Sequence, residues 1–329
     1  MLDFVRIALR VSRRALRWSL RALSATCTWL GWHARPDFLI IGAEKSGTTA
    51  LHYSLASHPD VVAPFTKELN YFSPETAFAI PDSPEYEWFA RIAEGDLDPA
   101  IRKETLRWYH SQFRVPIPGR HQLFYESTPC YLFFPQVARR IHAYRTDMKL
   151  IALLRDPVER AYSSWNMASQ WAEYPWIHDK RSFEAALSEE IEQLTRDPTT
   201  LKSYYLRQGI YHEQLRRYFE LFPRQQILII EHGELLSNRS ETLNTVCRFL
   251  GIPPFSSTRA WPELNVGTYS SGISPAIRDF LAEFYAPHNK ALFDLTGRTF
   301  EWTAPAARSQ GAAAVTKVTP PRTARPTAR

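Results

Sequence analysis

A run of glycine, lysine and hydroxyl-bearing residues at 42–49 (GAEKSGTT) directly follows the short apolar stretch 38–41 (FLII). Glycines let backbone N–H groups approach anionic oxygens, and the start of a following helix offers free N–H groups and a positive dipole end. Lys45 adds a positive charge, and Thr48 and Thr49 add hydroxyl donors. The stretch therefore predicts an anion site, with a plain strand–turn–helix of small residues as the simpler alternative.

The spacing of this loop resembles the nucleotide-binding pattern G-x-x-x-x-G-K-[ST], but Thr48 stands where that pattern has lysine, and the lysine is at position 45. A kinase or NTPase of that type also needs a magnesium-holding acid after a strand. Glu231 follows an apolar run, but nothing else in the sequence supports that role. A P-loop kinase or NTPase therefore stays as an alternative, and the displaced lysine ranks it lower.

A second candidate anion site begins at Arg155, which ends the apolar run 149–154 (KLIALL). Ser163 follows eight residues later, about two turns into the helix expected there. An arginine at a strand end can direct its two-pronged guanidinium onto a phosphate. The local alternative is a salt bridge from Arg155 to Asp156 or Glu159, with Asp156 capping the helix, and Arg155 considered alone favours it.

Together the two segments resemble the cofactor site of sulfotransferases that use 3′-phosphoadenosine 5′-phosphosulfate (PAPS). Residues 36–55 (PDFLIIGAEKSGTTALHYSL) resemble the 5′-phosphosulfate loop, and residues 153–165 (LLRDPVERAYSSW) resemble the 3′-phosphate site. This resemblance implies PAPS as co-substrate, with no metal required, and a second role for Lys45 in neutralising the leaving phosphate oxygen. The implied cofactor-binding residues are Lys45, Ser46, Gly47, Thr48, Thr49, Arg155 and Ser163. Two phosphate sites imply a nucleotide phosphorylated at both ends, which ATP is not.

Residues 67–73 (KELNYFS) resemble the KEPHFF segment of the heparan-sulfate-type branch of that family. The resemblance implies that Glu68 is the general base that takes the proton of an acceptor hydroxyl or amine. Asn70 stands where that branch has histidine, and Ser127 stands where its E-K-[ST]-P-x-Y segment has lysine. A carbohydrate is therefore the first expectation for the acceptor, and lipid-linked or small-molecule acceptors stay open.

The pattern of apolar runs predicts the α/β class: a three-layer P-loop-like fold with a central parallel sheet flanked by helices. Strands are expected at 38–41, near 61–63, and at 149–154 and 226–231, and helices at 135–144, 183–194, 211–221 and 240–250. Residues 73–122 are less regular and are expected to form an insertion or lid. We expect one sulfotransferase domain over residues 36–303.

The two ends of the chain are basic and differ from the body. Residues 1–35 and 304–329 carry net charges of +6 and +5 within a formal total of +6, so residues 36–303 carry −5. This distribution argues against nucleic-acid binding by the body, and residues 304–329 are expected to be a disordered basic tail.

Residues 1–33 predict an amphipathic helix with arginines at 6, 10, 13, 17 and 21. Three interpretations remain open: a helix lying on anionic lipid, a basic helix packed on the body, and an organelle transit peptide. A non-catalytic nucleotide-binding or membrane-scaffold protein is the corresponding alternative function. The three widely spaced cysteines, Cys27, Cys130 and Cys247, indicate a reducing compartment, so the expected location is cytoplasmic, with peripheral membrane contact as an option.

Overall fold

The computed structural model describes residues 2–73, 99–173, 178–197, 205–255, 269 and 272–302, with side chains from residue 15 in the first range and from residue 103 in the second. Five strands form one sheet: β1 (Phe38–Gly42), β2 (Val61–Val62), β3 (Leu123–Ser127), β4 (Lys149–Leu154) and β5 (Ile227–Glu231). All neighbouring strands pair in parallel, in the order β2-β3-β1-β4-β5. The carboxyl ends of all five strands therefore lie at one edge of the sheet.

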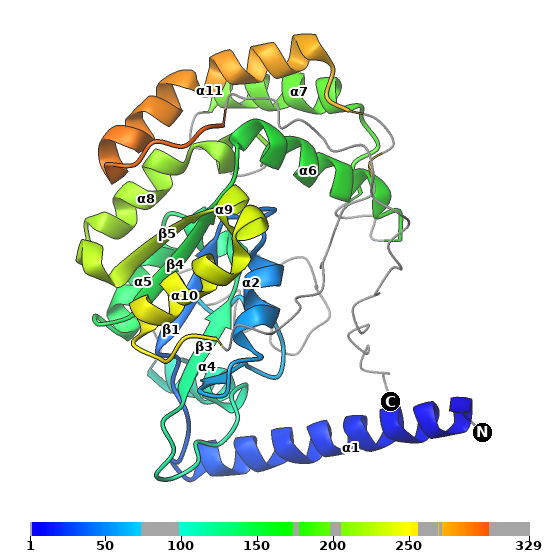
Figure 1. The fold of residues 1–329 in the computed structure, drawn as a ribbon, viewed down its shortest axis with the longest axis vertical. Helices are drawn as coiled ribbons and strands as arrows, with labels where there is room; N and C mark the ends of the chain where they lie inside the picture. The colour runs from blue at the N-terminus through cyan, green and yellow to red at the C-terminus, as the bar shows by residue number, and fades with distance from the viewer. Residues whose placement is uncertain are drawn as a thin grey trace.

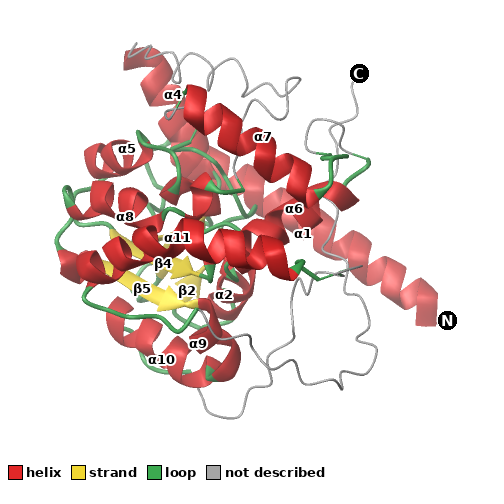
Figure 2. Ribbon diagram, turned by 90° about the horizontal axis from the view of Figure 1, so that it is seen from above, coloured by secondary structure: helices red, strands yellow, loops and turns green. Residues whose placement is uncertain are grey.

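Helices connect these strands and cover both faces of the sheet (Figures 1 and 2). The α-helices are α1 (Leu2–Trp29), α2 (Thr48–Leu55), α4 (Pro99–Ser111), α5 (Val137–Tyr144), α6 (Pro157–Gln170), α7 (Phe183–Arg196), α8 (Tyr211–Phe219), α9 (His232–Ser237), α10 (Arg239–Leu250) and α11 (Pro275–Thr296). Short 3₁₀ helices lie at Pro129–Leu132, Arg207–Gly209 and Arg224–Gln226.

The alternation of side chains along β1 explains the three layers. Leu39 and Ile41 point to one face, where they join buried side chains of α5 and α8. Phe38 and Ile40 point to the other face, where they join buried side chains of α2 and α10. A central strand covered on both faces must be apolar at every position, and all five residues of β1 are buried. A third cluster, formed by α6, α7 and α11, lies beside the sheet.

The predicted α/β class and the central parallel sheet flanked by helices are confirmed. Each predicted strand is present, and the helices expected at 135–144, 183–194, 211–221 and 240–250 are present with ends within two residues of the expected ones. The helix expected over residues 1–33 is present and ends earlier, at Trp29. The strand β3 and the helices α9 and α11 were not expected, nor was α4 within the stretch 73–122 that was expected to be irregular. The lid interpretation of residues 74–98 and the expected tail at 304–329 fall outside the described residues.

Candidate active site

The predicted phosphate loop runs from the end of β1 to the start of α2, as the sequence indicated. Gly42 has no room for a side chain, since a Cβ there would lie 2.6 Å from Leu132 Cβ and 2.9 Å from the carbonyl oxygen of Pro129. Gly47 caps α2 with a φ of 90°, a conformation that favours glycine. Ser46, in the turn between them, and Thr48, the first residue of α2, are both buried. The loop thus places the free N–H groups of the first turn of α2 at the carboxyl edge of the sheet.

The ammonium group of Lys45 lies largely buried in this loop without a carboxylate within salt-bridge distance among the described residues. Its hydrogen bond goes to the Met167 thioether at 3.2 Å, and a thioether is a weak acceptor. Burial lowers the pKa of Lys45, Glu44 and Glu68 oppose that shift, and Arg155 and Arg160 add to it. A desolvated cation beside two guanidinium groups is an environment that a bound anion would stabilise.

Arg155 joins the second predicted anion site to the first. Its Nη1 donates to the carbonyl oxygen of Lys45 at 3.2 Å, and the Tyr211 hydroxyl donates to the carbonyl oxygen of Arg155 at 2.9 Å. The local contacts considered from the sequence are also present: an Arg155–Glu159 ion pair of 3.7 Å, and Asp156 capping α6. The guanidinium group therefore lies between the Lys45 carbonyl oxygen and Glu159, and Tyr211 holds the backbone of Arg155.

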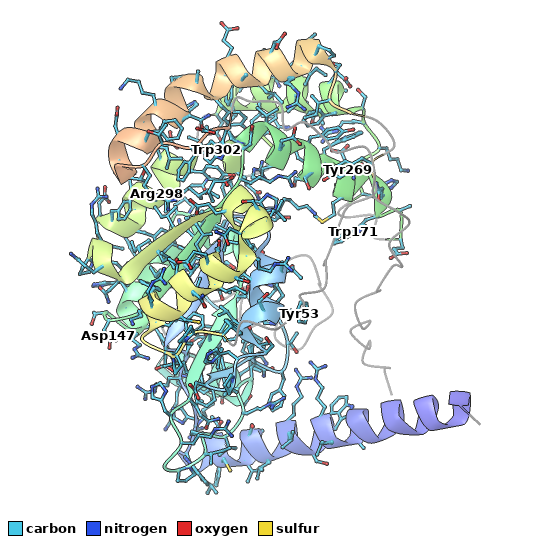
Figure 3. The ribbon with its side chains drawn as sticks, in the orientation of Figure 1. Tyr53, Asp147, Trp171, Tyr269, Arg298 and Trp302 are labelled. Carbon is cyan, nitrogen blue, oxygen red and sulfur yellow. The ribbon has the colours of Figure 1, made fainter. Side chains whose placement is uncertain are left out.

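Ser163 lies on α6 and is buried, and its Oγ accepts a hydrogen bond from the Tyr269 hydroxyl at 3.2 Å. The Tyr269 ring also stacks on Tyr162, with 5.8 Å between the ring centroids, and Figure 3 shows it beside α6. The sequence analysis did not single out Tyr269. No local spacing in the sequence marks it, because its partner Ser163 lies 106 residues earlier in the chain.

Glu68 lies in a tight turn after β2 that is fastened to the end of β3. The Glu68 N–H donates to the Ser127 carbonyl oxygen at 3.1 Å, and the Asn70 N–H donates to Thr128 Oγ1 at 3.4 Å. The Glu68 side chain is half exposed and forms an ion pair with Lys67. The carboxylate is thus held at the same edge of the sheet as Lys45 and stays open to a partner from solvent.

A buried carboxylate, Glu126, stabilises this turn through Thr128. It accepts hydrogen bonds from the hydroxyls of Tyr109 (2.8 Å), Tyr131 (2.9 Å) and Thr128. Burial raises the pKa of Glu126 to about 7, although these hydrogen bonds oppose the shift. Because its oxygens are already occupied by protein donors, Glu126 fixes the position of Thr128 and, through it, of the Glu68 turn.

Backbone strain concentrates at the same place. Among the described residues, the non-glycine residues with positive φ are Lys45 (66°), Glu68 (64°) and Asn70 (55°). Asparagine tolerates this conformation, whereas lysine and glutamate adopt it at a cost of about 1–2 kcal/mol. Such strain persists where the surroundings hold it, and it is concentrated at functional sites. The strain therefore falls on the two residues for which the sequence predicted catalytic roles.

His232 is a further residue of the site that the sequence analysis missed. A Cβ added to Gly47 would lie 3.0 Å from His232 Cδ2, so the imidazole packs directly against the phosphate loop. Burial, and then the charge of Arg155, lower the pKa of His232 to about 4, so the ring is neutral at neutral pH. Its signal in the sequence was its position directly after β5, because loops at carboxyl strand ends form the sites of such sheets.

Comparison with known proteins identifies the family. The family model described as "Sulfotransferase family" matches residues 36–257 of the chain. The chain belongs to the sulfotransferase family. This sulfotransferase is similar to the crystal structure of a sulfotransferase from Alicyclobacillus acidocaldarius, with 30% identity, a TM-score of 0.59, and coverage of 82% of this chain and 99% of the other. The predicted family and enzyme class are therefore confirmed.

Two curated relatives are heparan sulfate enzymes. The chain is 25% identical to heparan sulfate glucosamine 3-O-sulfotransferase 5 of Mus musculus, over 81% of this chain and 74% of the relative. It is 30% identical to the bifunctional heparan sulfate N-deacetylase/N-sulfotransferase 2 of Homo sapiens, over 67% of this chain and 22% of the relative. This sulfotransferase therefore spans about a fifth of the bifunctional protein.

Proposed function

We propose that this sulfotransferase transfers a sulfuryl group from PAPS to a hydroxyl or amine of a glycan, with Glu68 as general base. The observation that carries the proposal is that Lys45, Arg155 and Glu68 lie at one edge of the sheet. Arg155 donates a hydrogen bond to the Lys45 carbonyl oxygen, and the negative charge of Glu68 raises the pKa of the Lys45 ammonium. These residues come from three separate connections, and each has a distinct task in this reaction.

The nucleotide would be held by the two cationic loops. PAPS supplies the sulfuryl group, whose bond to the 5′-phosphate oxygen breaks as the acceptor bonds to sulfur. Lys45, Ser46, Gly47, Thr48 and Thr49 would bind the 5′-phosphosulfate, and Arg155 and Ser163 would bind the 3′-phosphate. The desolvated Lys45 ammonium favours this assignment, because its charge is available to balance the negative charge that grows on the leaving phosphate oxygen.

The acceptor would be activated by Glu68. A hydroxyl is a weak nucleophile until a base removes its proton in the transition state, and a half-exposed carboxylate can reach an acceptor that enters from solvent. The names of the heparan sulfate relatives support a glycan acceptor and both oxygen and nitrogen as the accepting atom. The three free cysteines support a reducing, cytoplasmic location as part of the proposal.

The first experiment is calorimetric binding of 3′-phosphoadenosine 5′-phosphate (PAP), compared with ADP and Mg·ATP. We expect selective binding of PAP, also in EDTA, because Lys45 and Arg155 supply the positive charge that the phosphates need. Arg155→Ala should weaken PAP binding about 10- to 100-fold, the effect of losing charged hydrogen bonds, and should change ADP binding little. Preference for Mg·ATP would instead favour a kinase or NTPase.

The matched control is Arg145→Ala. Arg145 is also partly buried and ion-paired, to Asp37 at 3.1 Å, but it lies at the amino end of the sheet, away from the site. An equal loss of PAP affinity in both variants would contradict the role of Arg155. Transfer of labelled sulfate from PAPS to an unsulfated polysaccharide, a glycolipid and a phenol would then compare the acceptor classes.

A further inference from the structure

From residue 15 onward, where the structure describes side chains, most of the large apolar side chains of α1 lie on the side that faces away from the rest of the protein, and Leu20 is half-buried. Within the described side chains, 50–70% of the surface of each of these residues is exposed: Leu16, Trp18, Leu23, Trp29 and, just beyond the helix, Leu30 and Trp32. The side in contact with the body is small or polar instead, with Ser24, Cys27 and Thr28 at most 8% exposed. A helix that packs on its own domain through an apolar stripe would instead bury its large apolar residues and expose its polar ones.

The contact between α1 and the body is made by the arginine-bearing side of the helix. Arg21 Nη2 donates to Thr66 Oγ1 at 2.8 Å and to Gln112 Oε1 at 3.2 Å, and the guanidinium lies 5.7 Å from the centre of the Phe65 ring. By helical register, the same arc of α1 carries the other arginines, at positions 6, 10, 13, 14 and 17. The opposite arc, which passes through Trp18, Ala22 and Trp29, contains no charged residue.

An anionic lipid surface fits this arrangement. Tryptophan favours the boundary between headgroups and acyl chains, and arginines beside an apolar arc can reach lipid phosphates. Residues 1–35 carry seven arginines and one acidic residue. The described helices include none that is long and apolar enough to cross a membrane, so α1 would lie along the surface. Figures 1 and 2 show α1 extending well beyond the α/β body, which leaves its outer side free to meet a flat partner.

We propose that α1 lies in the headgroup layer of an anionic membrane, with its uncharged arc in the lipid and its arginine arc facing lipid phosphates and the protein body. Of the interpretations considered from the sequence, packing on the body and contact with lipid are then compatible, because they use opposite sides of one helix. The catalytic body is held next to the membrane.

The test is sedimentation of the full-length chain with vesicles of phosphatidylcholine, with and without phosphatidylglycerol. We expect binding to the anionic vesicles and a loss of binding as salt is raised. The double substitution Trp18→Ser/Trp29→Ser should weaken vesicle binding about tenfold or more, because each indole loses its apolar contact with lipid. Its PAP affinity should stay unchanged, which shows that the body is folded. Trp171→Ser is the matched control, since Trp171 is exposed at the end of α6, and it should bind vesicles as the native protein does.

A second pair of substitutions, Arg13→Gln/Arg17→Gln, tests the charge. Each lost arginine should weaken binding to the anionic vesicles about fivefold, with no effect on phosphatidylcholine alone. Two results would overturn the proposal: equal vesicle binding by the native protein and the tryptophan double variant, or a concentration-dependent dimer without vesicle binding that the same variant abolishes. The dimer would show that a second copy of the chain covers this side of α1.

Discussion

Two carboxylates near the edge of the sheet have opposite environments, and this contrast assigns their roles. Glu126 is fully buried and takes hydrogen bonds from three hydroxyls, while Glu68 is half exposed and stands in a strained turn. A general base must reach the acceptor proton, and only a carboxylate that is accessible from solvent can do so. The environment therefore supports Glu68 as base and Glu126 as the group that positions it.

Glu68→Gln should reduce kcat by about 10²- to 10⁴-fold, the usual contribution of a general base, and leave PAP affinity nearly unchanged. Single-turnover transfer of labelled sulfate, together with calorimetry, measures both quantities. The matched control is Glu126→Gln, which should lower the free energy of unfolding because the amide cannot accept from all three hydroxyl donors. The assignment is wrong if Glu68→Gln keeps its turnover, or if it loses PAP binding along with turnover.

At the level of elements, the loop between β1 and α2 depends on a glycine for two reasons. Gly47 has a φ of 90°, and a side chain there would meet His232 at 3.0 Å. Gly119 has a similar φ of 75°, but no atom lies within 4 Å of the position its Cβ would take. Substitutions at these two glycines therefore distinguish the free-energy cost of the left-handed backbone, which both share, from the cost of crowding the phosphate loop, which only Gly47 has.

Gly47→Ala and Gly119→Ala should each lower the free energy of unfolding by about 1–2 kcal/mol, the cost of a left-handed alanine. Only Gly47→Ala should also weaken PAP binding, by about tenfold or more, since His232 and the loop must move apart. Urea titration and calorimetry on both variants provide the two readouts. Similar PAP affinities in the two variants would show that the loop does not depend on the contact with His232.

The elements that sequence patterns revealed are those with a strong local signal. The apolar runs of β1, β4 and β5 stand out because strands covered on both faces are apolar throughout. The strand β3 was missed because its sequence, LFYES, mixes apolar and polar residues: Tyr125 joins the core, while Glu126 pairs with buried tyrosines. The position of β3 between β2 and β1 could not be predicted either, because the order of strands in the sheet differs from their order in the chain.

The predicted site residues divide in the same way. Lys45 and Arg155 lie in local motifs, and the structure brings these motifs together. His232 and Tyr269 contribute through contacts with Gly47 and Ser163, which are distant in sequence, so no local spacing marks them. The roles assigned to Glu68, Lys45 and the cofactor-binding residues stay predictions until the substitutions are measured.

At the level of the whole molecule, the segment after α11 returns to the sheet and fastens the junction of β5 with α9. Arg298 donates to the Ile229 carbonyl oxygen at 2.6 Å and pairs with Glu234 at 2.7 Å. Trp302 is 8% exposed, stacks on Phe300, and donates from Nε1 to Glu231 at 3.2 Å. Figure 3 shows Arg298 and Trp302 on the same side of the molecule. Since His232 follows Glu231, this segment also supports the wall of the phosphate loop.

Trp302→Ala should therefore lower the free energy of unfolding by about 3–5 kcal/mol, because it empties a packed aromatic site. Trp302→Phe should cost less, since it keeps most of the apolar contact and loses the hydrogen bond to Glu231, worth about 1 kcal/mol. Trp32→Ala is the control: that side chain is 50% exposed, and its removal should change stability by about 0.5 kcal/mol at most. Urea denaturation followed by circular dichroism gives all three values. If Trp302→Ala costs no more than Trp32→Ala, residues 298–302 do not stabilise the junction, and the position of His232 must depend on α9 and the sheet alone.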